Sequence, residues 1–267
     1  MKYILITGAS SGIGEAFARR LASEKHNLYL VARSEDKLQA LCEELSQKHD
    51  ISAKYLSVDL IEVDSDLAVF EATEKEAIEI DWLINNAGFG SMGDFAKLDL
   101  ERELEMIELN ITAVVALTHH YLGKMRERGS GTIINVSSAA GFQPLPFFAT
   151  YAATKAFVTS FTEAIAEENR PFGIRVLALC PGTTETGFFE ASGIEDPIKM
   201  KGVQTPDQVV DAALSALKRG RSKIVSGWTN YMVASAVNIL PNSLITRVAG
   251  KPLRKRYQNP DREEGTT

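Results

Sequence analysis

The sequence predicts an α/β fold: a doubly wound, seven-stranded parallel sheet with helices on both faces. Short apolar runs alternate with longer amphipathic ones along most of the chain, which is typical of parallel β-α-β units. A loop of small residues, TGASSGIG, joins the first apolar run to the first helical pattern. No linker, repeat or low-complexity segment interrupts the pattern. We therefore expect a single domain over residues 1–267, with a C-terminal extension from about residue 228.

The expected elements follow one another in regular order. Strands are predicted at residues 3–6, 27–32, 53–58, 82–85, 132–136, 175–179 and 223–225. Helices are predicted at residues 13–23, 35–49, 64–79, 100–128, 151–169 and 206–218, the fourth with Gly123 as a weak point. Ligands of such sheets bind beyond the carboxyl ends of the strands. Residues that follow a strand are therefore the first candidates for a site.

Composition narrows the classes of function. The chain is 45% hydrophobic, enough for a buried core, and its net charge of −6 argues against nucleic acid as a partner. Cys42 and Cys180 form no CxxC pair and are expected to be buried thiols of a reducing compartment. No secretory signal and no apolar run of the ~18 residues that a membrane span needs is evident, so a cytoplasmic protein is expected. His119 and His120 face different ways on a helix, and we expect no metal site.

Three glycines, Gly8, Gly12 and Gly14, lie between the first strand and the first helix. Glycine lets the backbone approach a ligand closely and adopt positive φ, and the N–H groups of a helix N-terminus bind phosphate. The strand–loop–helix context favours a pyrophosphate site over a tight turn without a ligand. The spacing is GxxxGxG, which differs from the common GxGxxG fingerprint, and the loop lacks the lysine of an NTPase phosphate loop.

Polar residues at the ends of the next strands extend this candidate site. Arg33 follows the second strand, where an arginine accommodates the 2′-phosphate of NADP and an acid would bind the ribose of NAD. Lys37 adds a second charge, although both cations also fit a solvated surface next to acidic neighbours. Asp59 and Asn86 end the third and fourth strands, where adenine and ribose would lie, although either residue is also common in turns and caps. NADP(H) is therefore the favoured cofactor, and NAD(H) the less favoured one.

A reactive group of side chains follows the fifth strand. Ser137 and Ser138 come at its end, and Tyr151 and Lys155 stand at positions i and i+4 of the next helix, on one face. A lysine ammonium lowers the pKa of a nearby phenol, so we expect Tyr151 to act as general acid or base. A serine hydroxyl beside it would hold a carbonyl oxygen. The alternative, a part-buried tyrosine with a surface lysine, is disfavoured by the serines at the strand end.

These motifs together resemble the short-chain dehydrogenase/reductase family. The resemblance runs from residue 3 to about residue 225. Its motifs are TGASSGIG, NNAG at 85–88, Asn110, the set Ser138, Tyr151 and Lys155, and PGTTET at 181–186. The resemblance implies a Rossmann fold that interconverts a carbonyl and an alcohol, with hydride chemistry supplied by a nicotinamide cofactor.

The resemblance also implies a role for each matching residue. Tyr151 would donate the proton in carbonyl reduction, and Lys155 would bind the nicotinamide ribose and lower the pKa of the tyrosine. Ser138 matches the catalytic serine better than Ser137, and Asn110 would hold a water that relays protons to Lys155. Thr184 and Thr186 would contact the nicotinamide end and the phosphates. The residues implied in cofactor binding are Gly8, Ser10, Ser11, Gly12, Ile13, Gly14, Arg33, Asp59, Asn86, Tyr151, Lys155, Thr184 and Thr186.

Two features depart from the family pattern. The glycine loop lacks the basic residue of some NADP-preferring members, so Arg33 must carry that preference. The chain also continues for about forty residues past the last predicted strand, which puts in doubt the tetramer contacts that simpler members make there. Pairing through the helices at 100–128 and 151–169, and hence a homo-oligomer, is what the resemblance implies.

Two apolar segments point to the class of small-molecule substrate. In the family, the regions corresponding to residues 142–148 (FQPLPFF) and 187–202 wall the substrate pocket and form its lid. Their aromatic and aliphatic residues, which in the second segment are Phe188, Phe189, Ile194 and Met200, favour a hydrophobic ketone or aldehyde over a sugar, unless they serve the core or a dimer contact. The alternatives are an NAD-linked dehydrogenase of a hydroxysteroid-like alcohol and a non-catalytic dinucleotide-sensing protein.

The C-terminal extension allows two interpretations. Residues 231–240 are apolar but too few to span a bilayer, and residues 251–256 are basic. A helix packed on the protein's own surface or on a partner subunit, followed by a solvated tail, is favoured over an interfacial helix that meets a membrane or lipid-like substrate. Residues 261–267 are expected to be disordered.

Overall fold

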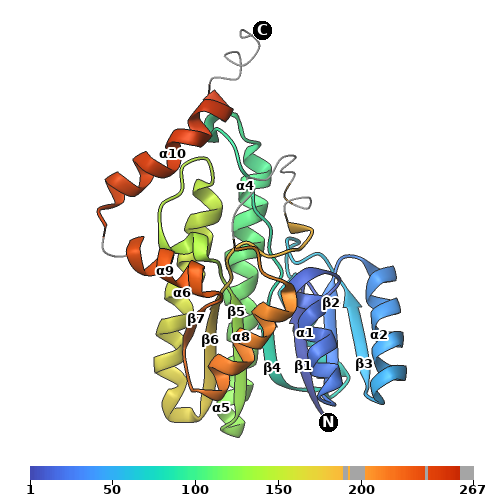
Figure 1. Cartoon of the computed structure of the whole chain (residues 1–267). Helices are drawn as coiled ribbons and strands as arrows, with labels where there is room; N and C mark the ends of the chain where they lie inside the picture. Colours follow the sequence, from blue (N-terminus) through green and yellow to red (C-terminus); the bar gives the residue numbers. More distant parts are fainter. Residues whose placement is uncertain (189–191, 193–201, 238–239, 259–267) are drawn as a thin grey trace.

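Seven parallel strands form one sheet in the computed structural model, which describes residues 1–188, 192, 202–237 and 240–258 (Figure 1). The strands are β1 (Lys2–Thr7), β2 (Asn27–Ala32), β3 (Ala53–Ser57), β4 (Glu79–Asn85), β5 (Gly131–Val136), β6 (Ile174–Cys180) and β7 (Lys223–Val225). Their order is β3-β2-β1-β4-β5-β6-β7, and every neighbouring pair is parallel. The predicted fold class is confirmed. The strand order reverses between β1 and β4, where such sheets bind their ligands.

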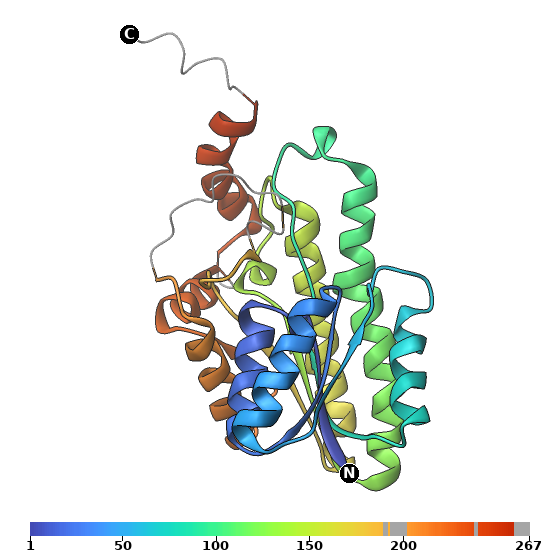
Figure 2. The ribbon, with the colours of Figure 1, turned by 90° about the vertical axis from the view of Figure 1, so that its right-hand side faces the viewer.

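Helices cover both faces of the sheet (Figures 1 and 2). One face carries α1 (Gly12–Ser23), α2 (Glu35–His49) and α8 (Pro206–Lys218), and the other carries α3 (Ser65–Lys75), α5 (Ala113–Arg128) and α6 (Ala149–Asn169). Successive side chains of a strand point to opposite faces. Accordingly, Ile4 and Ile6 of β1 join the first buried cluster, and Tyr3 and Leu5 join the second. Burial on both sides explains why the strands are continuously apolar.

The long helix predicted over residues 100–128 is interrupted at a different place from the one expected. α4 (Leu100–Ile107) passes through a π-helical turn (Glu108–Thr112) into α5. The helix continues unbroken through Gly123, where an added Cβ would meet nothing within 4 Å. The π turn instead carries the buried Asn110, and such turns are frequent at functional sites.

The segment between α3 and β4 also differs from the prediction. A helix was expected over residues 64–79, but α3 ends at Lys75, and Ala77 adopts a left-handed conformation with φ of 50°. β4 then begins at Glu79, before the expected start at residue 82, and buries Ile80 in the second cluster. Pairing of the strand with β1 therefore ends the helix earlier than its sequence pattern indicates.

The C-terminal extension forms two helices, α9 (Trp228–Val237) and α10 (Asn242–Gln258). The predicted tail differs in conformation, because α10 continues through the basic run and through Pro252, but most of this run is exposed to solvent as expected. The expected disorder of residues 261–267 lies outside the described residues. Within the described part of the chain, no helix has both the length and the apolar character needed to cross a membrane.

The inner side of α10 packs on the loop that precedes α6. Ile245 is buried, and a Cβ added at Gly250 would lie 3.3 Å from Pro146. The ring of Tyr257 stacks on Phe147, with centroids 5.5 Å apart. These contacts hold the extension over the carboxyl ends of the strands (Figure 1).

Candidate active site

The glycine loop lies at the point where the strand order reverses. Gly8 and Gly12 adopt φ of +63° and +58°, which glycine tolerates without strain. A Cβ added at Gly14 would lie 2.3 Å from the carbonyl oxygen of Gly8, so the first turn of α1 needs a glycine there. The backbone of this loop therefore comes close to the cavity, and the residues that line it include Ser10, Ser11, Gly12 and Ile13.

Asn86 holds this loop in place from the end of β4. Its amide Nδ2 donates to the carbonyl oxygens of Thr7 (3.0 Å) and Gly8 (3.1 Å). In return, the hydroxyl of Thr7 accepts from the backbone N–H groups of Asn86 (2.9 Å) and Ala87 (3.0 Å). Asn86 lines the cavity as expected, but its side chain is committed to the loop, and Thr7 is a partner that the sequence reasoning missed.

Arg33 and Asp59 face one another beyond β2 and β3. The guanidinium Nη1 lies 3.5 Å from the Asp59 carboxylate, and the side chain of Arg33 is 67% exposed. Asp59 also accepts from the backbone N–H of Ile61 (3.1 Å). Both residues and Lys37 line the same cavity as the glycine loop. Two cations thus stand at its outer end, where a phosphate would be stabilised.

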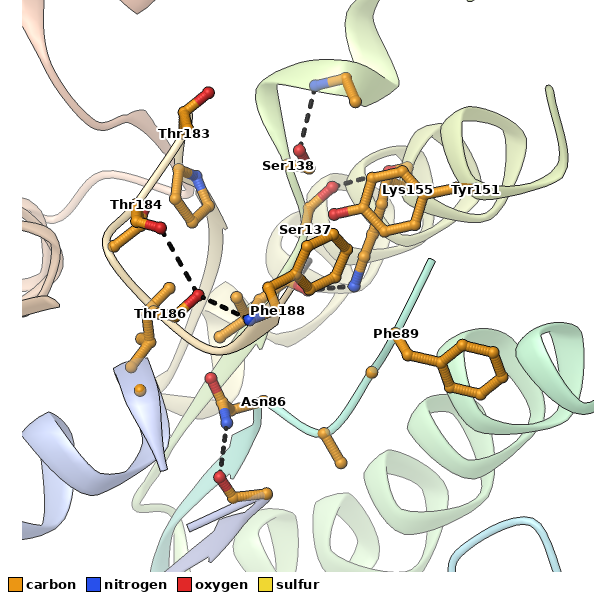
Figure 3. Close-up of a pocket in the computed structure, with 18 of the residues that line it drawn as sticks. Asn86, Phe89, Ser137, Ser138, Tyr151, Lys155, Thr183, Thr184, Thr186 and Phe188 are labelled. Carbon is orange, nitrogen blue, oxygen red and sulfur yellow. Dashed lines mark hydrogen bonds between the residues drawn. The ribbon is translucent and has the colours of Figure 1, made fainter. Parts of the chain in front are cut away.

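Tyr151, Lys155 and Ser138 come together at the inner end of the cavity (Figure 3). Tyr151 and Lys155 lie one turn apart on α6, and the Lys155 Nζ is 5.8 Å from the centre of the Tyr151 ring. This amine donates to the carbonyl oxygen of Val136 (3.0 Å), at the end of β5. The i, i+4 spacing therefore places both groups where the sequence predicted them.

The two serines after β5 have different surroundings. Ser137 is buried, donates to the Lys155 carbonyl oxygen (2.7 Å) and shares a hydrogen bond with Thr159 (2.7 Å), so it fastens α6 to the strand. Ser138 caps the following turn by accepting from the Ala140 N–H (3.1 Å), and its hydroxyl lies close enough to Tyr151 to act on the pKa of that phenol. This difference favours Ser138 over Ser137 as the serine beside the reacting group.

Burial controls the protonation of the reactive pair. Phe148 stacks on the Tyr151 ring (4.5 Å between centroids) and Phe188 lies on it at 5.3 Å. This burial raises the pKa of Tyr151 to about 12, although the neighbouring Ser138 hydroxyl acts in the opposite direction. Burial lowers the pKa of Lys155 to about 8. The expected lowering of the tyrosine pKa by Lys155 is therefore absent from this structure: burial raises the pKa, and the one opposing effect comes from Ser138.

Asn110 connects the π turn to the floor of the site. Its Nδ2 donates to the Phe89 carbonyl oxygen (2.9 Å) and to the Thr154 hydroxyl (3.1 Å), and its Oδ1 accepts from the Phe89 N–H (3.2 Å). A Cβ added at Gly88 would lie 2.7 Å from Asn110 Oδ1 and 3.3 Å from Lys155 Nζ. Asn110 and Lys155 therefore border the same small space without bonding directly. The water relay remains a prediction.

The loop after β6 closes the cavity against the glycine loop. Thr186 donates to the Thr184 carbonyl oxygen (3.5 Å) and accepts from the Phe188 N–H (3.3 Å). A Cβ added at Gly12 would lie 3.0 Å from the Thr186 methyl group. Both threonines line the cavity. Of the expected lid residues, Phe189, Ile194 and Met200 lie outside the described residues.

The C-terminal extension contributes a wall that the sequence reasoning missed. Val233 and Val237 of α9 and Leu253 of α10 line the cavity together with Leu145 and Phe148 of the predicted 142–148 segment. The apolar run at 231–240 signalled burial of some kind, but nothing in the sequence placed it at the site. Arg102 of α4, which lies 4.1 Å above the Phe89 ring, is a second lining residue that was missed.

The cavity, of about 660 Å³, runs from Arg33 and the glycine loop to Tyr151. The residues present fit a dinucleotide, because the glycine loop at the N-terminus of α1 and Arg33 line one end of the cavity, and Tyr151 and Lys155 line the other. Within the described part of the chain, no group of three or more His, Cys, Asp and Glu residues is placed to hold a metal ion.

Comparison with known proteins decides the family. A family model described as short chain dehydrogenase matches residues 2–196. The chain belongs to the short-chain dehydrogenase family. The resemblance of its motifs to this family is thereby confirmed, and the chain is an oxidoreductase of this family.

Several relatives of this short-chain dehydrogenase are similar over most of its length. The 7beta-hydroxysteroid dehydrogenase of Mediterraneibacter gnavus is 33% identical over 229 residues, which are 85% of this chain and 86% of that protein. A short-chain dehydrogenase from Sphingobium yanoikuyae, solved in complex with NADPH, is 35% identical with a TM-score of 0.79, covering 84% of this chain and 87% of that one. A solved 7beta-hydroxysteroid dehydrogenase reaches a TM-score of 0.84 at 28% identity, covering 93% and 96%.

Proposed function

We propose that this short-chain dehydrogenase is an NADP(H)-dependent oxidoreductase that interconverts a hydrophobic ketone or aldehyde and the corresponding alcohol. One observation carries the proposal: a single cavity joins the glycine loop and Arg33 to Ser138, Tyr151 and Lys155. When bound, NADPH supplies the hydride that reduces the carbonyl carbon. The rest of the reaction is the work of the protein's own side chains.

Tyr151 supplies the proton that the reduced oxygen requires. Its phenol keeps that proton through the neutral pH range, because burial holds its pKa at about 12. The Ser138 hydroxyl, which lies beside Tyr151, donates to the same carbonyl oxygen and stabilises the charge that develops there. In the oxidative direction Tyr151 receives the proton of the alcohol. Lys155 and Asn110 border the same small space next to Gly88. In this proposal, the proton of Tyr151 is exchanged with solvent through that space.

The substrate class follows from the walls near Tyr151. Phe148, Phe188, Leu145, Val233 and Val237 give this end of the cavity an apolar lining, which favours a bulky hydrophobic carbonyl compound over a sugar. The hydroxysteroid dehydrogenases among the relatives support the same class.

The preference for NADP(H) over NAD(H) is assigned to Arg33. A guanidinium with 67% of its side chain exposed, held beside the cavity 3.5 Å from Asp59, is placed to pair with a 2′-phosphate. The NADPH complex of the Sphingobium yanoikuyae relative supports this preference. An NAD-linked enzyme remains the second candidate, because the Asp59 carboxylate beside Arg33 is also able to accept from a ribose hydroxyl.

Titration of both reduced cofactors tests this assignment. In Arg33→Ala, the dissociation constant for NADPH is expected to rise about 10- to 100-fold, while that for NADH stays within about 3-fold. Arg221→Ala, which removes an exposed arginine away from the cavity, is the matched control and leaves both constants unchanged. Tighter binding of NADH than NADPH by the wild type would instead support the NAD-linked candidate. Binding of either cofactor without turnover of any carbonyl compound would support a dinucleotide-sensing protein.

We also infer a homo-oligomer that pairs through α4, α5 and α6. Leu100 and Leu104 of α4 are 65% and 53% exposed, and Phe157 of α6 is 41% exposed and stacks on Phe161. An apolar surface of this kind is stabilised by a second copy.

A further inference from the structure

The outward side of α9 and α10 is unusually apolar. Seven of the sixteen large hydrophobic side chains that are exposed among the described residues lie between positions 228 and 248. Trp228 is 74% exposed and Val248 is 63% exposed. Exposed apolar surface gathered in one place marks an interaction site.

Basic residues share this surface with the apolar ones. Leu244, Arg247, Val248 and Lys251 stand at helical positions i, i+3, i+4 and i+7, so they form one stripe along α10. The rest of the helix circumference faces the protein, with Ile245 and Gly250 buried. The expected packing of the extension on its own chain therefore accounts for the inner side of α10 and leaves the outer stripe uncovered by the described residues.

The charge of α10 indicates what kind of partner covers this stripe. The helix contains five basic residues and no acidic one. This leaves the rest of the chain at a net charge of −11, against −6 for the whole. Arg247, Lys251 and Arg254 form no ion pair with any described residue. A second copy on this face would bring two such basic helices together, so an anionic partner fits better.

The same helices border the mouth of the cavity. Val233 is 58% exposed and also lines the cavity, as does Leu253 of α10. Both ribbon views place α9 and α10 on one side of the molecule, beyond the carboxyl ends of the strands (Figures 1 and 2). Whatever covers the outward surface therefore lies close to the entrance that a substrate uses.

We propose that the outward face of α9 and α10 docks on an anionic lipid bilayer. The basic residues meet the lipid headgroups, Leu244 and Val248 enter the headgroup–acyl boundary, and Trp228 lies at the interface, a position that indole rings favour. The acidic remainder of the protein is repelled and faces water, which orients the molecule. In combination with the proposed function, this docking presents the cavity mouth to an apolar carbonyl compound dissolved in the membrane.

Co-sedimentation of the full chain with lipid vesicles tests the proposal. Vesicles containing phosphatidylglycerol are expected to carry down at least about fivefold more protein than vesicles of phosphatidylcholine alone. Raising the salt to about 0.5 M, which shortens the Debye length to roughly 4 Å, is expected to release most of it. The tryptophan emission should shift to the blue on binding, and Trp228→Phe should abolish the shift, since Trp82 is the only other tryptophan.

Matched variants separate this surface from general effects of charge and hydrophobicity. Val248→Asp is expected to abolish vesicle binding, whereas Val63→Asp, at an 88% exposed position, retains it. The pair Arg247→Glu and Lys251→Glu is expected to abolish it as well. The pair Lys48→Glu and Lys75→Glu, which changes the net charge equally at exposed positions elsewhere, retains it.

Two results would overturn the proposal. One is that the wild type shows no preference for anionic vesicles. The other is that the control variants lose vesicle binding as completely as the variants of α10. A shift of Val248→Asp from oligomer to monomer in light scattering, with no vesicle binding by the wild type, would assign the surface to a second copy. Turnover of a water-soluble ketone is expected to be unchanged in Val248→Asp, so failure of docking and failure of the proposed activity are distinguishable.

Discussion

Tyr151 and Lys155 share one wall of the cavity, and burial moves their pKa values in opposite directions. It raises the first to about 12 and lowers the second to about 8, so each is pushed toward its neutral form. At pH 7 the phenol still keeps its proton, and the amine is still mostly charged. In the proposed reaction, the ligand-free protein would therefore hold a protonated phenol as the proton donor for carbonyl reduction, with a cationic amine nearby.

A pH-dependent stability measurement tests the burial of Lys155. Its pKa is about 8 when folded and about 10.5 when unfolded, so the unfolded chain binds more protons between these values. The free energy of unfolding of the wild type, relative to Lys155→Met, is therefore expected to rise as the pH increases from about 8 to about 10.5. Denaturant titrations at several pH values check this. A difference that stays flat or falls over that window would contradict a buried, destabilised ammonium.

Sequence spacing predicts which reactive side chains meet but leaves their energetics open. The i, i+4 relation of Tyr151 and Lys155 and the serines at the end of β5 were sufficient to place them together. The direction of the tyrosine pKa shift depends on Phe148, which stacks on its ring, and on Phe188, which lies tilted against it; loop packing sets both contacts. Local sequence pattern carries no information about that packing.

At the scale of elements, two glycines test how the site is built. A Cβ at Gly14 would lie 2.3 Å from the Gly8 carbonyl oxygen and 2.6 Å from Asn86 Nδ2, so Gly14→Ala is expected to weaken NADPH binding at least about tenfold and to destabilise the fold by about 1–3 kcal/mol. Gly123→Ala, which meets nothing within 4 Å in the exposed part of α5, is expected to stabilise by about 0.5–1 kcal/mol. Thermal unfolding and cofactor titration of both variants give the comparison. If both substitutions left stability and NADPH affinity unchanged, the glycine loop would be able to accommodate a Cβ at position 14, against this prediction.

The predicted bounds of helices and strands were wrong where contacts with residues distant in sequence determine them. The π turn between α4 and α5 follows from Asn110, whose three hydrogen bonds reach Phe89 and Thr154. α3 ends before Ala77, which adopts a left-handed conformation. An alanine in the sequence does not predict that conformation, because residues other than glycine rarely adopt it. By contrast, α2, β2 and α8 match their predicted bounds because their periodicity and flanking residues agree with their packing.

At the scale of the whole molecule, the cofactor is expected to stabilise the native state. A ligand at about 100 times its dissociation constant adds roughly 2.7 kcal/mol to the free energy of unfolding. This raises the melting temperature of a chain of this size by about 5–10 °C. NADPH should produce such a shift, and NADH at the same concentration about half of it or less, if Arg33 pairs with the additional phosphate as proposed. Thermal melting with each cofactor measures this difference. Equal shifts would contradict the assignment of Arg33.

Turnover by Tyr151→Phe tests the central claim most directly. This substitution keeps the buried ring between Phe148 and Phe188 and removes only the hydroxyl that we propose as the proton donor. With NADPH and an apolar ketone, kcat is expected to fall about 10²- to 10⁴-fold, while the NADPH dissociation constant stays within about 3-fold of the wild type. A kcat within a few-fold of the wild type, at unchanged NADPH affinity, would contradict the claim that Tyr151 is the proton donor.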